Sequence, residues 1–192
     1  TGTITTGKMK VSKVIMYDDK LLSKNFNELM IAFVNQMEDN NATFKALKKY
    51  FKGDTIYEKQ CNVPFSSERK WSAMSFKNIG SIVVGAPEKL FLKSGKEVPQ
   101  DVIDLQKKGK RILGIAFSNK IISEHELPDL NIIALVVLED PLRKNAKEML
   151  GYFKKQGVDI KVVSGDNAIT VSNIAKAAGL DSYDSYIDLS TI

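Results

Sequence analysis

The chain has 192 residues, of which 43% are hydrophobic and 27% charged, so it is long enough to bury the core of one domain or of two small ones. Its longest apolar run, residues 132–138, is far shorter than the roughly 20 residues of a membrane-spanning helix, and its single cysteine, Cys61, excludes an intramolecular disulfide and suits a reducing cytosol. The net charge of +5 comes from lysines interspersed with acidic residues, so we expect no nucleic-acid partner.

Residues 11–51 predict one strand followed by two helices. The β-branched run at 11–17 is typical of a strand. Asn25, with Glu28 three residues later, has the spacing of a helix capping box. The apolar residues that recur at helical spacing, and that we assign to the core, are Leu29, Met30, Phe33, Val34 and Met37 in the first helix and Phe44, Leu47 and Phe51 in the second.

The middle of the chain changes to short strands separated by turns. Strands are predicted at residues 57–63, 70–76, 81–84 and 111–117. Two helices interrupt them, one opened by Pro87 and one at 101–108 closed by Gly109. We therefore expect a mainly antiparallel sheet flanked by helices, which is an α+β fold.

Beyond Pro141 the pattern becomes that of an α/β protein. A helix closed by Gly157 precedes a buried-type strand at 160–163, and a further helix follows that strand. The residues leave two alternatives open for the strand at 132–138. It either starts a right-handed crossover to 160–163, or belongs to the central sheet and is followed by a hinge at Asp140-Pro141.

The segment 162–167 connects this last strand to the last helix through Ser164 and Gly165. At such a junction a hydroxyl group and several unpaired backbone N–H groups face one point, which suits a phosphoryl oxygen. The same residue types are ordinary in turns and helix caps, so the segment taken alone favours plain capping over a phosphate site.

A series of partial motifs in chain order resembles those of the P-type ATPases, whose phosphorylation domain is haloacid-dehalogenase-like. The motifs are Thr1-Gly2-Thr3 with Thr5-Thr6, Phe65 to Ser75, Gly85-Ala86-Pro87-Glu88, Lys110-Arg111, Glu139-Asp140-Pro141-Leu142-Arg143 and Ser164-Gly165-Asp166-Asn167. Val84 stands where the family has a lysine, Leu142 where it has a second proline and Ser164 where it has a threonine. The resemblance covers nearly the whole chain, and it implies that the chain starts just after the phosphorylated aspartate and its lysine.

The resemblance implies an adenine-nucleotide site in the central region. Phe65 would stack on the adenine and Lys70 would lie near the nucleotide. Gly85 would let the backbone approach the base, and Arg111 would reach the phosphates. Met37, Glu38 and Asp39 lie where the family often places an acidic residue near the adenine, and Glu38 is the contact that this implies. Taken alone, Phe65 is interpreted as a core residue, and a plain exposed strand residue explains Arg111 nearly as well as a phosphate contact does.

The resemblance also implies an incomplete phosphoryl-transfer site. Its residues would be Thr1, Thr3, Ser164, Gly165 and Asp166, and the backbone of Thr1 would contact Mg²⁺. Asp140 and Arg143 would form the hinge and contact ATP. The implied division is a nucleotide-binding domain at 8–139, joined to fragments of an α/β haloacid-dehalogenase-like (Rossmannoid) phosphorylation domain at 1–7 and 140–192.

The implied function is ATP binding in the cytoplasmic portion of a cell-membrane pump that couples ATP hydrolysis to cation transport through an aspartyl phosphate. ATP and Mg²⁺ would be its cofactors, and the rest of the pump (phosphorylation, actuator and transmembrane domains) its partner. The isolated chain would be an inactive monomer that binds nucleotide.

Two alternatives stay open. One is a soluble haloacid-dehalogenase-like phosphatase whose middle domain serves as a substrate cap. The other is a non-enzymatic module that binds a protein partner. His125 lies in a loop context between two glutamates, and we assign it no role.

Overall fold

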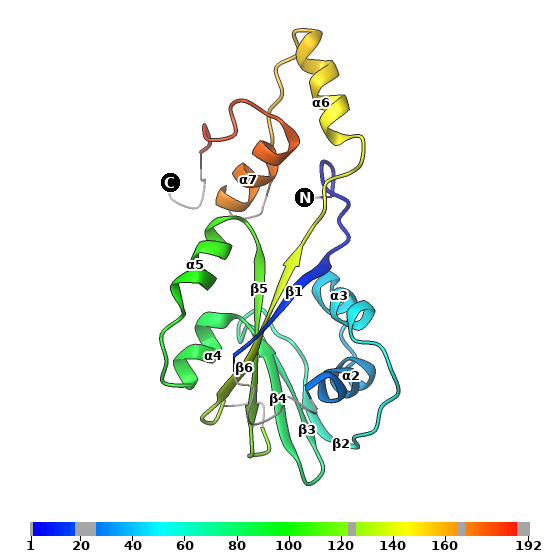
Figure 1. Cartoon of the computed structure of the whole chain (residues 1–192), viewed down its shortest axis with the longest axis vertical. Helices are drawn as coiled ribbons and strands as arrows, with labels where there is room; N and C mark the ends of the chain where they lie inside the picture. The colour runs from blue at the N-terminus through cyan, green and yellow to red at the C-terminus, as the bar shows by residue number, and fades with distance from the viewer. Residues whose placement is uncertain (1, 18–25, 123–125, 165–167, 188–192) are drawn as a thin grey trace.

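The computed structural model describes residues 2–17, 26–122, 126–164 and 168–187, and it is built around one antiparallel sheet (Figure 1). Six strands form this sheet in the order β1-β6-β5-β4-β3-β2, and every neighbouring pair is antiparallel. The strands are β1 (Lys10–Met16), β2 (Lys59–Val63), β3 (Trp71–Phe76), β4 (Gly80–Gly85), β5 (Arg111–Ser118) and β6 (Asn131–Glu139). The expected α+β fold is therefore confirmed.

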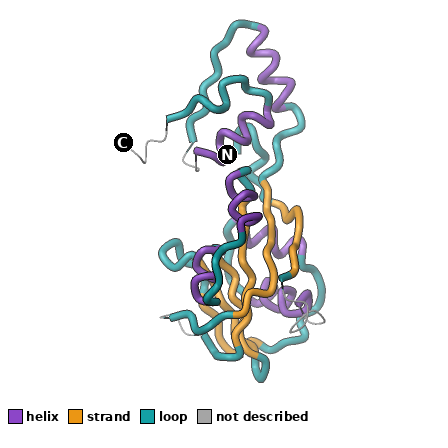
Figure 2. The backbone as a smooth tube through the Cα atoms, turned by 60° about the vertical axis from the view of Figure 1, so that its left-hand side comes forward, coloured by secondary structure: helices purple, strands orange, loops and turns teal. Residues whose placement is uncertain are grey.

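Helices cover both faces of the sheet, and Figure 2 shows them (purple) on either side of the strands (orange). The helices are α2 (Phe26–Gln36) and α3 (Ala42–Tyr50) on one face and α4 (Pro87–Lys93) and α5 (Gln100–Lys107) on the other. Because successive side chains of a strand point to opposite faces, one strand serves two cores. In β3, Met74 and Phe76 join the core with α2 and α3, whereas Trp71 and Ala73 join the core with α4 and α5.

The helix ends follow the local sequence signals. Asn41 caps α3, because its side-chain oxygen accepts a hydrogen bond of 2.8 Å from the backbone N–H of Phe44. Pro87 is the first residue of α4, and Gly109 adopts a positive φ just after α5. Glu28 lies in the first turn of α2, while Asn25, its predicted capping partner, lies outside the described residues.

A smaller part of the chain lies beyond one end of the sheet and contains α6 (Ala146–Lys155) and α7 (Ala168–Ala178) (Figure 1). The prediction of a buried strand at 160–163 is wrong. These residues form no strand, and Val163 is 95% exposed. A strand needs a hydrogen-bonded neighbour, and this segment pairs with no strand in the part of the chain that the structure describes.

The position of β6 decides between the two alternatives for residues 132–138. Since β6 pairs with β1 and β5, it belongs to the central sheet, and the crossover interpretation is wrong. The chain leaves β6 through Asp140 and Pro141, next to the N-terminal segment, where Thr5 and Leu142 form an antiparallel bridge. None of the helices within the described ranges has the length and apolar content that a membrane crossing requires.

Candidate functional site

A cavity of about 1070 Å³ lies among α3, the β2–β3 loop, the start of α4 and the α5–β5 turn, and α7 borders it from the smaller part. Four residues with expected nucleotide contacts line it: Phe65, Lys70, Gly85 and Arg111. Glu38 is not among the lining residues, whereas its neighbour Asp39 is. Residues from motifs that are far apart in the sequence therefore line the same cavity.

Phe65 presents its ring at this cavity, with 44% of the residue's surface exposed. The alternative that Phe65 is a core residue, which its residue type alone suggests, is therefore wrong. Its backbone N–H points at the carboxylate of Asp39, with 3.4 Å between the nitrogen and Oδ2. An exposed ring beside a carboxylate offers a planar stacking surface and a hydrogen-bond acceptor, both of which suit a base with an exocyclic amine.

Lys70 ends the β2–β3 loop (residues 64–70), which also contains Phe65, and it has a φ of +63°. Its N–H donates to the carbonyl of Ser66 at 2.8 Å, and its own carbonyl accepts from the N–H of Ala86 at 2.9 Å, so the backbone ties this loop to the start of α4. Its ammonium lies 3.9 Å from the carboxylate of Glu88, and both side chains are about half exposed. Such a pair contributes little to stability, so an anionic ligand could replace the carboxylate at low cost.

Gly85 ends β4 and packs tightly against β3. A Cβ atom built there would lie 2.6 Å from the Cβ of Trp71 and 2.8 Å from the carbonyl oxygen of Lys70, so any other residue would force a shift. Gly85 thus has a packing role in addition to the expected approach to a base. Val84, in place of the expected lysine, is buried and lines the cavity, where it offers apolar contact without charge.

Arg111 begins β5, and its Nη1 donates a hydrogen bond of 3.1 Å to the hydroxyl of Thr43 in α3. No carboxylate among the described residues pairs with this guanidinium. Lys110 differs, because its ammonium lies 2.6 Å from the carboxylate of Glu139, which also pairs with Lys10 at 3.0 Å. Hydrogen bonds from Lys110 and Lys10 lower the pKa of Glu139. Arg111 is therefore the better placed of the two cations to receive an anion.

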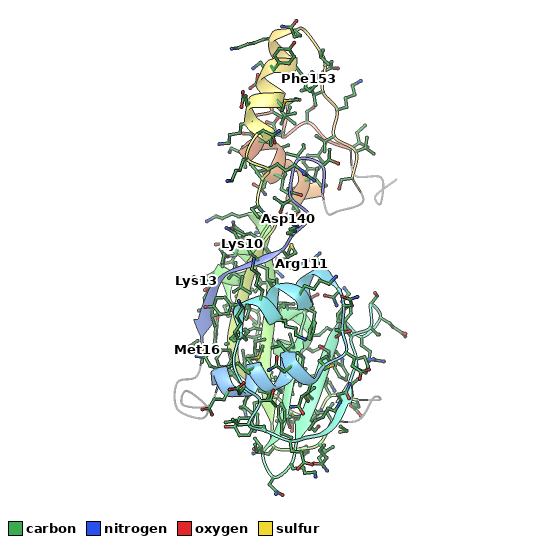
Figure 3. All side chains as sticks on the ribbon, turned by 90° about the vertical axis from the view of Figure 1, so that its right-hand side faces the viewer. Lys10, Lys13, Met16, Arg111, Asp140 and Phe153 are labelled. Carbon is green, nitrogen blue, oxygen red and sulfur yellow. The ribbon has the colours of Figure 1, made fainter. Side chains whose placement is uncertain are left out.

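Asp140 and Arg143, the residues of the predicted hinge, bond the N-terminal segment to the chain that leaves β6. The carboxylate of Asp140 accepts hydrogen bonds from the hydroxyls of Thr5 at 2.7 Å and Thr6 at 3.1 Å. The guanidinium of Arg143 donates to the carbonyls of Gly2 at 2.8 Å and Thr5 at 3.1 Å. Figure 3 places Asp140 between the sheet and the smaller part. Neither Asp140 nor Arg143 lines the large cavity, and Asp140 borders a second one of about 290 Å³.

Three of the five residues of the expected phosphoryl site, Thr1, Gly165 and Asp166, lie outside the described residues. His125, to which no role is assigned, lies outside them as well. Thr3 is exposed in the N-terminal segment, and Ser164 is partly buried ahead of α7. The start of α7 at Ala168 agrees with the predicted helix. The expected convergence of N–H groups on a phosphoryl oxygen therefore stays a prediction.

The structure places Asp39 and Thr43 at the large cavity, and neither was the predicted contact. Asp39 belongs to the segment Met37-Glu38-Asp39, in which the sequence favours Glu38 as the acidic contact. Thr43 has no sequence signal beyond its place in the first turn of α3. The Thr5–Asp140 hydrogen bond was also missed, because nothing local in the sequence relates the two.

Comparisons with known proteins agree with the motifs. The model of the haloacid dehalogenase-like hydrolase family matches residues 1–191. The probable cation-transporting ATPase exp7 of Streptococcus pneumoniae is 38% identical over 100% of this chain, which covers 25% of that protein. The calcium-transporting ATPase CtpE of Mycobacterium tuberculosis is 33% identical over 94% of this chain, which covers 23% of that protein.

A more distant relative is the potassium-transporting ATPase ATP-binding subunit of Staphylococcus aureus, which is 25% identical over 95% of this chain. The chain thus spans about a quarter of the length of the curated relatives that it matches. It belongs to the haloacid dehalogenase-like hydrolases, and its motifs and relatives place it with the P-type ATPases of that family.

Proposed function

We propose that this chain is the ATP-binding cytoplasmic portion of a P-type ATPase that transports a cation, and that the large cavity holds the nucleotide. The observation that carries the proposal is the convergence on one cavity of residues from three separate motifs, namely Phe65 and Lys70 from one motif, Gly85 from a second and Arg111 from a third. A volume of about 1070 Å³ is slightly above the range of roughly 300 to 1000 Å³ that is typical of small-molecule sites, so the cavity has room for a nucleotide. The relatives named as cation-transporting and calcium-transporting ATPases support the transport context.

In this proposal the base stacks on Phe65 beside Asp39, and the phosphates extend toward Lys70 and Arg111. Stacking of a base on an aromatic ring contributes about 1 to 3 kcal/mol. The cations attract the phosphates, and a guanidinium also matches their geometry. Glu38 and Asp39 are adjacent, so the expected acidic contact with adenine passes from Glu38 to Asp39.

We propose the domain division at 8–139 for nucleotide binding, with 1–7 and 140–192 as parts of the phosphorylation domain. Asp140 and Arg143 then serve as the joint, because they bond residues 2–6 to the chain that leaves β6. Thr1, Thr3, Ser164, Gly165 and Asp166 belong to the proposed phosphoryl site. The remaining phosphorylation, actuator and transmembrane domains would be the partners, and the isolated chain is expected to be a monomer.

Mg²⁺ is the metal that this chemistry implies. The described residues hold no group of three or more carboxylate, imidazole or thiol side chains that could bind a metal. Mg²⁺ is commonly held by the phosphates of a nucleotide together with only one or two protein groups, which is compatible with this cavity. When bound, it would neutralise charge on the phosphates. Lys70 and Arg111 would orient those phosphates, and Phe65 would hold the base.

The experiment is a titration of the folded 192-residue chain with adenosine, ADP and ATP, followed by backbone amide chemical shifts. We expect saturable binding on the order of millimolar, or about −4 kcal/mol. Phe65→Ala should weaken binding of adenosine and ATP alike, by about 1 to 3 kcal/mol. Lys70→Ala should weaken ATP binding and spare adenosine.

Lys120→Ala is the matched control, because Lys120 is exposed and does not line the cavity. It should bind like the unaltered chain. If ADP and ATP at high concentration give no saturable response in a folded chain, the proposal fails. The cap-bearing phosphatase of the same family is the function to test next in that case.

A further inference from the structure

Arg69 lies in the same loop as Phe65 and Lys70 but does not line the cavity. Its Nη2 donates a hydrogen bond of 2.8 Å to the carbonyl of Pro64, the residue before Phe65. Its guanidinium carbon lies 5.5 Å from the centre of the Trp71 ring, a cation–π contact. One side chain therefore contacts both ends of the loop, at Pro64 and at Trp71.

The two contact points differ in burial. Trp71 is the first residue of β3, is only 5% exposed and belongs to the core with α4 and α5, so it is a fixed anchor. Pro64 is exposed and follows the end of β2. The guanidinium thus ties the exposed start of the loop to the buried core, and Phe65 comes directly after the tied carbonyl.

Backbone contacts within the loop act in the same direction. The N–H of Arg69 donates to the hydroxyl of Ser66 at 3.1 Å, and the N–H of Lys70 donates to the carbonyl of Ser66 at 2.8 Å. These bonds close the turn between Phe65 and Lys70, but neither bond reaches the core. The Arg69 side chain connects this turn to a buried ring.

Within the part of the chain that the structure describes, the Arg69 guanidinium is held by contacts other than an ion pair. No carboxylate among the described residues lies within ion-pair distance of it, and its Nε is buried without a hydrogen-bond partner. The hydrogen bond to Pro64 and the contact with the Trp71 ring are therefore the interactions that place this guanidinium.

We propose that Arg69 is a positioning residue for the nucleotide base. It orders residues 64–70 before any ligand arrives, so that the ring of Phe65 already faces the cavity. The role at the base rests on the proposed nucleotide function, whereas the ordering of the loop does not. Ordering a binding loop in advance removes an entropic cost from binding, which raises affinity without a contact to the ligand.

The test compares Arg69→Met, which keeps an apolar stem over Trp71 but has no donors, with Arg69→Lys, which keeps a cation. Lys120→Met is the matched control on an exposed lysine outside the cavity. Trp71 is the only tryptophan, so its fluorescence reports the cation–π contact directly. Amide hydrogen exchange of residues 65–70, measured without nucleotide, reports the order of the loop.

In Arg69→Met we expect faster amide exchange at 65–70, altered Trp71 emission, and affinities for adenosine and ADP that fall by the same factor, roughly threefold to tenfold. Equal factors point to the base, since loss of a phosphate contact would spare adenosine. Arg69→Lys should recover part of the Trp71 signal and part of the affinity. Exchange in β4 and β5 should stay slow, which shows that the fold is intact.

Unchanged exchange at 65–70 together with unchanged Trp71 emission in Arg69→Met would overturn the inference and leave the proposed function standing. A selective loss of ADP binding, with adenosine unaffected, would overturn it as well, because Arg69 would then act on the phosphates. If the unaltered chain binds no nucleotide, the proposed function fails together with the role at the base.

Discussion

The carboxylate of Asp140 accepts a hydrogen bond of 2.7 Å from the hydroxyl of Thr5, although 135 residues separate the two in the chain. Thr5 is fully buried, and the same carboxylate also accepts a hydrogen bond from the hydroxyl of Thr6. The backbone adds to this contact, since the N–H of Thr6 donates to the carbonyl of Pro141 at 2.9 Å. The two segments that join the sheet to the smaller part therefore form one connected unit.

Thr5→Val should destabilise the chain, because it keeps the shape of the side chain and removes the donor to Asp140. Loss of a hydrogen bond to a charged, partly buried acceptor costs about 1 to 3 kcal/mol of unfolding free energy. Urea denaturation measures the change. Thr3→Val is the matched control, since Thr3 is exposed and its side chain makes no hydrogen bond among the described contacts. Equal stability of the two variants would contradict the role of the Thr5–Asp140 bond.

Gly85→Ala should destabilise the sheet and weaken nucleotide binding together. The added Cβ would meet the Cβ of Trp71 at 2.6 Å, and overpacking of this kind costs about 1 to 3 kcal/mol. Gly151→Ala is the opposite control, because Gly151 lies in α6 and a Cβ added there would meet nothing within 4 Å. That variant should gain about 0.5 to 1 kcal/mol from helix propensity. Thermal unfolding of both variants checks the two signs.

Glu139 should make stability depend on pH. Lys110 and Lys10 lower its pKa below the ordinary 4.5, so its contribution is present above that value and is lost as the pH falls through the lowered pKa. Glu139→Gln should therefore be less stable than the unaltered chain near neutral pH, by about 1 kcal/mol or less for a partly exposed pair. The difference should shrink in acid and in high salt.

Urea denaturation at neutral and acidic pH measures this effect. Glu58→Gln is the comparison, because Glu58 pairs with Lys77 where both side chains are largely exposed. That variant should change stability less at either pH. A Glu139→Gln deficit that persists undiminished in acid would show that the carboxylate charge is not its cause.

Asn173→Ala should loosen α7 from the rim of the large cavity. The side chain of Asn173 donates hydrogen bonds of 2.9 Å to the carbonyls of Lys107 in α5 and Ile169 in α7. Its loss should cost about 1 kcal/mol and should raise amide exchange in α7 more than in the sheet. Asn145→Ala is the matched control, because Asn145 makes no side-chain capping bond at the start of α6. Similar exchange in both variants would count against the contact.

Much of the sheet follows from local sequence patterns. The runs that form β3, β4 and β5 carry β-branched and aromatic residues, and glycines and asparagines lie in the turns beside them. The residues that favour strands locally are therefore also the ones that the sheet buries. The helices are equally predictable, since Asn41 and Pro87 act within one turn of themselves.

The errors arise where structure depends on distant residues. Residues 160–163 have the composition of a buried strand, but strand formation needs lateral hydrogen bonds that no described segment supplies. The choice between Glu38 and Asp39 depends on how the chain turns after α2 ends at Gln36. The Thr5–Asp140 contact depends on the pairing of β1 with β6, which no local pattern specifies.

The pairing of β1 with β6 also sets the order in which the sheet can be completed. Lys10 lies opposite Glu139, so β1, which leaves the ribosome before the other strands of the sheet, must wait for β6 before it has a neighbour. Closing so long a loop slows folding, because its entropy is lost before the contacts form. Before β1 pairs with it, β6 is an open and strongly apolar edge of the sheet. A chain that lacks β1 would leave this edge exposed to self-association.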